Sequence, residues 1–88
     1  MVESLPNLGP KSNGMLQRAG ITTIGRLREL GAARAYVLVK RSGARASLNL
    51  LWALEGALTD RPWQEVAKND RLSLMLQVES LEKGEYAL

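Results

Sequence analysis

Glycine and proline residues divide this chain into short segments whose apolar residues recur at helical spacing. Pro10 suits the first position of a helix, where its missing N–H costs nothing, and Gly20 suits a left-handed helix end. Gly31 and Gly43 bracket a further segment of helical length. No stretch alternates apolar and polar residues for long enough to predict a β-strand. The pattern therefore predicts an all-α fold.

We expect about five short helices with short connections between them. Thr22 or Thr23 caps the second helix, and Ser47 caps the fourth. Pro62 starts one isolated turn before the last helix. The expected helices cover residues 10–19, 24–30, 32–41, 48–58 and about 70–83. A chain of 88 residues has room for one domain built from these helices.

The segment from Leu48 to Leu58 is apolar on nearly all sides of the helix that it predicts, as in a central, buried helix. We expect a core built on Leu51, Trp52, Leu54, Leu58 and Trp63. Glu55, inside this segment, has no carboxylate, histidine or cysteine at helical spacing. We therefore expect it to pair with an arginine or accept backbone N–H bonds rather than catalyse a reaction. We expect Asn49 to hydrogen-bond to a neighbouring helix.

The chain contains neither cysteine nor histidine. Disulfides, cysteine metal sites and the commonest general base are therefore excluded, and we expect no enzymatic activity, no metal and no cofactor. No apolar run, residues 50–54 included, approaches the roughly 20 residues that a membrane span requires. The first residues lack the basic start and apolar stretch of a signal peptide. We expect a cytoplasmic domain that contacts no membrane and has no small-molecule substrate.

Charge is distributed unevenly along the chain. Residues 1–45 carry eight cationic and two acidic side chains, whereas residues 46–88 carry four cationic and seven acidic ones. This asymmetry indicates either a basic face for a polyanion or an evenly solvated surface with no partner.

A first candidate site is the loop Asn7–Ser12, where the first helix begins. A helix N-terminus offers unpaired N–H groups and the positive end of the helix dipole, so it can bind a phosphate. We name Gly9, Lys11 and Ser12 as candidate nucleic-acid contacts. The alternative is a purely structural turn into the helix.

A second candidate site is the segment 40–47, which we expect to form a loop before the apolar helix. Lys40, Arg41 and Arg45 are its cations. The segment could hold an anion at the N–H groups that follow Ser47, with Arg41 and Arg45 as clamps. The alternative is a solvated basic loop, since no aromatic residue within it could stack on a base.

The last helix carries more apolar residues than one buried face requires. These are Leu72, Leu74, Met75, Leu76, Val78 and Leu81. They predict either a homodimer that packs through this helix or a helix that is buried on two sides within the monomer.

Three strings of residues resemble the C-terminal domain of the TfoX (Sxy) family. They are residues 5–11, residues 19–23, and residues 47–58 followed by Trp63. The resemblance implies a helix-hairpin-helix-like fold and a relation to bacterial regulators of DNA transformation (competence). We expect one such domain over residues 1–88, without the N-terminal domain that precedes it in the competence regulators.

Together these observations predict a non-enzymatic binding or regulatory module that binds DNA weakly through phosphates, using its basic half. The alternative is a protein–protein adaptor or self-association module that binds no nucleic acid.

Overall fold

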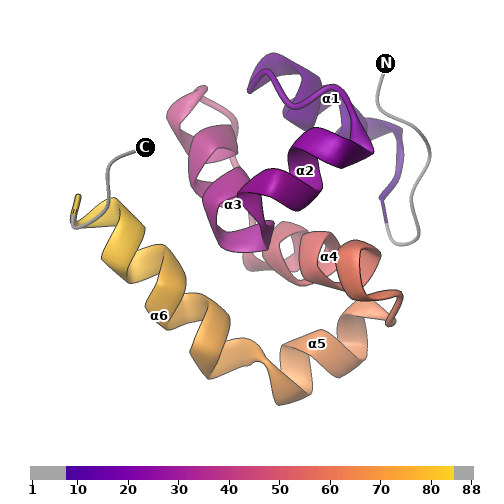
Figure 1. Cartoon of the computed structure of the whole chain (residues 1–88), viewed down its shortest axis with the longest axis vertical. Helices are drawn as coiled ribbons and strands as arrows, with labels where there is room; N and C mark the ends of the chain where they lie inside the picture. The colour runs from indigo at the N-terminus through magenta and orange to yellow at the C-terminus, as the bar shows by residue number, and fades with distance from the viewer. Residues whose placement is uncertain (1–7, 85–88) are drawn as a thin grey trace.

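The computed structural model describes residues 8–84, which form six α-helices and no β-strand (Figure 1). The helices are α1 (Pro10–Arg18), α2 (Ile24–Leu30), α3 (Ala32–Arg41), α4 (Leu48–Thr59), α5 (Trp63–Asn69) and α6 (Arg71–Glu82). The expected all-α single domain is confirmed. The isolated turn expected after Pro62 is instead the seven-residue helix α5. Of the loop before α1, Leu5, Pro6 and Asn7 lie outside the described residues.

Local hydrogen bonds end α1 and start α2 as the sequence predicts. Gly20 has a positive φ of 85°, and its N–H donates to the carbonyl of Gln17 at 3.0 Å. The N–H of Ile21 donates to the carbonyl of Leu16 at 2.8 Å, which completes a Schellman motif. Thr23 Oγ1 accepts a hydrogen bond from the N–H of Arg26 at 3.0 Å and so caps α2.

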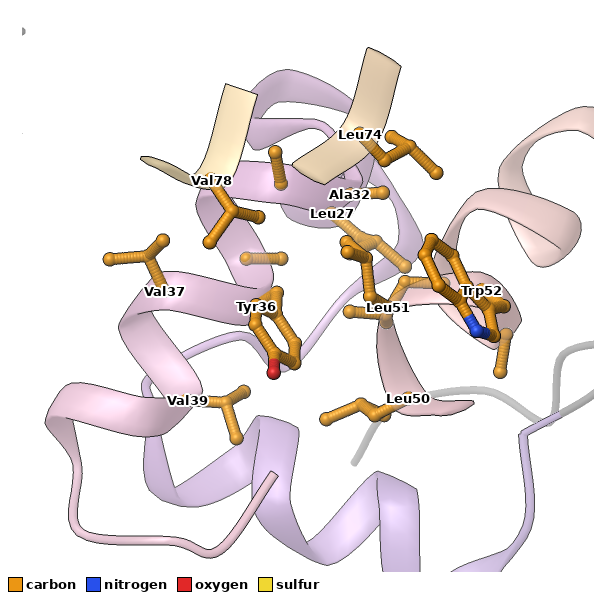
Figure 2. Packing of buried hydrophobic residues seen from close by; sticks show 14 of the residues in the cluster. Leu27, Ala32, Tyr36, Val37, Val39, Leu50, Leu51, Trp52, Leu74 and Val78 are labelled. Carbon is orange, nitrogen blue, oxygen red and sulfur yellow. The ribbon is translucent and has the colours of Figure 1, made fainter. Parts of the chain in front are cut away.

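Helices α3 and α4 occupy the middle of the molecule, with α1 and α2 at one end and α5 and α6 at the other (Figure 1). Helix α5 packs against α4, and α6 packs along α3. Leu51, Trp52 and Leu54 are buried in the core that these helices share. Figure 2 shows Leu51 and Trp52 among the core residues. Leu58 and Trp63, which we also expected in the core, are only partly buried and pack against its edge.

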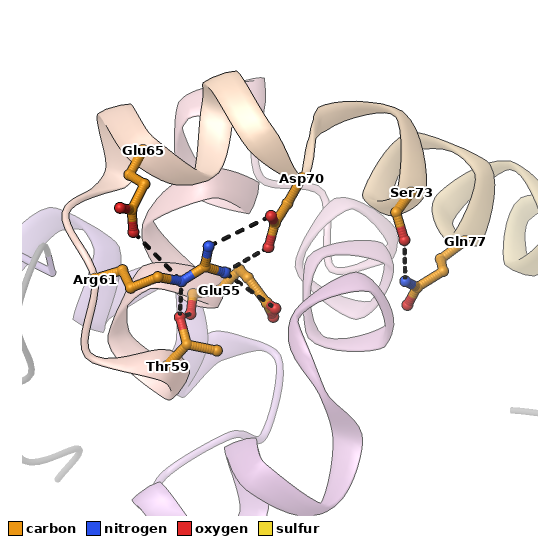
Figure 3. Close-up of polar contacts among 7 residues, drawn as sticks. All are labelled: Glu55, Thr59, Arg61, Glu65, Asp70, Ser73 and Gln77. Carbon is orange, nitrogen blue, oxygen red and sulfur yellow. Dashed lines mark hydrogen bonds and ion pairs between the residues drawn. The ribbon is translucent and has the colours of Figure 1, made fainter.

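Arg61 connects α4, α5 and the residue before α6 (Figure 3). Its guanidinium lies 3.9 Å from the carboxylate of Glu55 on α4 and 3.7 Å from that of Glu65 on α5. Two of its N–H groups donate to the carboxylate of Asp70, which precedes α6. Glu55 therefore pairs with an arginine, as expected. The hydrogen bond from Arg61 lowers the pKa of Asp70 below its ordinary value.

Within residues 8–84, no helix is long and apolar enough to cross a membrane. The same residues contain no group of three or more acidic side chains arranged to hold a metal ion.

Candidate functional site

Lys11 on α1 and Arg45 in the connection between α3 and α4 line two adjoining hollows in the surface. The hollows have volumes of about 370 Å³ and 520 Å³, and both are also lined by Met15. We call the two together the cationic groove. Its lining residues are Pro10, Lys11, Ser12, Gly14, Met15, Arg18, Gly43, Ala44, Arg45, Ser47, Asn49, Leu50, Ala53 and Trp63.

The groove carries positive charge that its own walls do not neutralise. Lys11, Arg18 and Arg45 are exposed, and none of the described lining residues is acidic. None of these three cations forms an ion pair with another residue of the described range 8–84. Cations that lack acidic neighbours produce a positive potential, which attracts anions.

The first turns of two helices line the groove and add to this potential. Lys11 and Ser12 belong to the start of α1, while Ser47 and Asn49 lie at the start of α4. Gly9, the N-cap of α1, has no side chain, and Ser47, the N-cap of α4, makes no side-chain hydrogen bond to its helix. Ser47 therefore occupies the expected cap position without capping through its hydroxyl. Uncapped helix N-termini leave N–H groups available to an anion.

Gly14 lies on α1 between Lys11 and Arg18 and lines the groove with both of them. A Cβ atom added at Gly14 would meet no atom within 4 Å, and its φ is not positive. Neither packing nor backbone conformation therefore requires glycine here, although glycine within a helix costs about 1 kcal/mol relative to alanine. Its missing side chain keeps the surface between the two cations open.

The rest of the lining is uncharged and includes one aromatic ring. Trp63, the first residue of α5, is partly buried and lines the same hollow as Arg45. Asn49 is exposed and lines this hollow too, so the expectation that it bonds to a neighbouring helix is wrong. The groove thus combines cations, small polar side chains and a tryptophan.

The structure merges parts of the two sites expected from the sequence. Lys11 and Ser12 from the first and Arg45 from the second line one groove. Gly9 is the exposed N-cap of α1 beside it. Arg41 is exposed at the end of α3 but lines neither hollow of the groove.

Lys40 lies outside the groove. Lys40 and Arg41 end helix α3, so the expected loop begins only after them. The ammonium of Lys40 donates a hydrogen bond of 2.6 Å to Glu82 on α6, which raises the pKa of Lys40. It also lies 5.5 Å from the centre of the Tyr36 ring. Lys40 therefore pairs with an acidic side chain on α6 and does not line the groove.

Most residues that line the groove were not among the contacts expected from the sequence, and they include Gly14, Arg18, Asn49 and Trp63. Arg18 follows Lys11 by two helical turns, so helical periodicity alone places both on one face. No local pattern shows that Trp63 reaches the same groove, because it comes from a different helix.

Two comparisons with known proteins assign this domain to a family. Residues 1–78 match the model of the TfoX C-terminal domain. A curated relative is "DNA transformation protein TfoX" of Haemophilus influenzae, which is 36% identical over 74 residues. The aligned region covers 84% of this chain but 34% of the relative, so the chain spans about a third of that protein. No solved structure matches significantly. The chain belongs to the TfoX C-terminal domain family.

Proposed function

We propose that the cationic groove binds the phosphate backbone of DNA and that the domain is a non-enzymatic binding module. The observation that carries this proposal is the convergence of Lys11, Arg18 and Arg45 on one groove whose described lining residues include no acid. The two uncapped helix starts at the same groove support it, because their N–H groups suit phosphate oxygens.

The spacing of the cations fits a single strand of the backbone. Lys11 and Arg18 lie seven residues apart on α1, which corresponds to about 10 Å along the helix axis. Along the axis of a DNA duplex, the same length is covered by about three base pairs. Gly14 lies between them, so the strand can approach the helix closely. Contacts of this kind read charge and shape rather than base sequence.

The relative's name connects it with DNA transformation, and we propose that this domain serves the same process by contacting DNA. Three phosphate contacts give weak binding, so the domain contributes affinity without selecting a sequence. A DNA site would then be selected by a partner that acts together with the domain.

The direct test is a titration of two duplexes of unrelated sequence at several salt concentrations, followed by fluorescence anisotropy. We expect equal affinity for the two duplexes and a plot of log K against log salt with a slope of about −3, since each phosphate contributes about −0.9. Absence of binding at low salt contradicts the proposal. A strong preference for one duplex also contradicts it.

A further inference from the structure

The hollow that contains Trp63 differs in its lining from the rest of the cationic groove. Its volume is about 370 Å³, and four apolar side chains line it: Met15, Leu50, Ala53 and Trp63. Leu50 and Ala53 are buried members of the core, whereas Met15 and Trp63 are partly buried and pack against the core. We call this hollow the tryptophan pocket. An apolar lining with a few polar groups is typical of sites that bind a small molecule or a part of a larger one.

A phosphate group alone does not account for the tryptophan pocket. Phosphate oxygens bind to cations and N–H groups, and an apolar wall offers them no hydrogen bond. The adjoining hollow offers a phosphate more charge, because it is lined by Arg18 as well as by Lys11 and Arg45, and none of its described lining residues is aromatic. The tryptophan pocket therefore suits a group that has apolar faces and is attached to a phosphate.

A nucleotide combines these two properties, and the cations are placed to hold its phosphate. Lys11 and Arg45 line both hollows, so they lie where the tryptophan pocket meets the rest of the groove. A nucleotide whose phosphate binds there can turn its base into the pocket. The ring of Trp63 then offers the base a surface for stacking, which is possible for every base because each has a π-face.

Asn49 adds a polar group that suits the edge of a base. It lines the tryptophan pocket and is exposed. Its amide forms no hydrogen bond with another residue of the described range 8–84. Because an amide carries both donors and an acceptor, it can bond to the edge of any of the four bases.

We propose that the tryptophan pocket takes an unpaired base of single-stranded DNA, which stacks on Trp63 while its phosphate binds Lys11 and Arg45. In a duplex the bases are paired and stacked, so none enters the pocket without leaving its partner. A single strand has no pairing to break. Other proteins bind single strands in this way, with a cationic groove and an aromatic ring. The inference rests on the proposed function and adds that an unpaired base is part of the ligand.

Fluorescence anisotropy of the whole chain with three labelled probes tests the inference. The first probe is an oligothymidine of about 12 nucleotides, which is within the site sizes of single-strand-binding domains. The second is an abasic strand of the same length, which keeps the phosphates but has no base to stack, and the third is a duplex. We expect the oligothymidine to bind about fivefold more tightly than the abasic strand, the lower end of the effect of one stacked base.

The three probes separate failure of this inference from failure of the proposed function. If the duplex binds but the oligothymidine and the abasic strand bind with equal affinity, the inference is overturned and the proposed function stands. If no probe binds at low salt, both are overturned.

Variants of Trp63 test whether the base lies in this pocket. Trp63→Leu keeps an apolar side chain at this partly buried position but removes the aromatic ring, so the ratio of oligothymidine to abasic affinity should fall toward unity. Trp63→Phe retains a ring and should keep a higher ratio than Trp63→Leu. Gln64→Ala changes the exposed neighbour, which lines neither hollow, and should keep the wild-type ratio.

The ratio also separates stacking from folding, because a loss of folded protein weakens the binding of both strands equally. A wild-type ratio in Trp63→Leu means that the base binds elsewhere, and this result overturns the inference.

Discussion

Lys11 and Arg45 line the same groove although they belong to distant parts of the chain. The packing of α1 against α3 brings them together, because the chain leaves the end of α3 and runs past α1 before α4 begins. The groove is thus a product of tertiary structure, and its charge comes from two segments that carry few acids.

Gly14 provides a test that separates stability from binding. Gly14→Ala should raise the free energy of unfolding by about 0.5–1 kcal/mol, because alanine is the better helix former and its Cβ meets no atom. The same change should weaken DNA binding, since the added methyl group lies between Lys11 and Arg18. Urea unfolding and DNA titration measure the two effects.

The matched control is Gly25→Ala on α2, which lies outside the groove. Its Cβ would lie 4.0 Å from Thr23 Oγ1, an ordinary contact. We expect no loss of DNA affinity in this variant. Equal DNA affinity of Gly14→Ala and wild type would show that no ligand approaches this part of α1.

Trp63 should report on occupancy of the groove. It lines the hollow beside Arg45, whereas Trp52 is buried in the core. Binding of DNA should therefore change the tryptophan emission of the wild type, and Trp63→Phe should abolish the change while retaining measurable affinity. A change of equal size in Trp63→Phe would mean that the signal comes from Trp52 and not from the groove.

Asp70 should contribute to stability in a pH-dependent manner. Arg61 lowers the pKa of Asp70 in the folded state, so the ionised carboxylate stabilises the fold at pH values above its unfolded pKa, about 3.9. This contribution is lost as the pH falls through the lower folded value. Asp70→Asn should therefore be less stable than the wild type at neutral pH, and the difference should shrink below about pH 4.

Urea unfolding of both proteins at several pH values measures this difference. Glu79→Gln is a useful comparison, because Lys83 likewise lowers the pKa of Glu79 but this exposed pair joins residues of one helical segment. At neutral pH, Glu79→Gln should lower the free energy of unfolding less than Asp70→Asn does. A stability difference for Asp70→Asn that is independent of pH would exclude the carboxylate charge as its cause.

The sequence predicted those features that depend on local hydrogen bonds. Gly20 and Thr23 set the end of α1 and the start of α2 through bonds that span a few residues. The length of helix α5 was underestimated because only Pro62 marks its start in the sequence. The burial of Val66 stabilises this helix, and that burial depends on other helices.

The site was predictable only in part, for a related reason. Arg45 and Lys11 could be named as candidates from their charge and their positions near helix starts. Lys40 has the same charge, but its partner Glu82 lies on α6, far along the chain. Lys40 pairs with Glu82 instead of lining the groove because α6 packs on α3. Local sequence patterns do not reveal this packing.

The salt dependence of DNA binding by Arg45→Ala tests the central claim most directly. Loss of one phosphate contact should reduce the magnitude of the slope of log K against log salt by about 1. Arg28→Ala removes the same charge from an exposed position on α2 outside the groove, and its slope should equal that of the wild type. If the two variants have equal slopes and affinities, the groove is not the DNA-binding site.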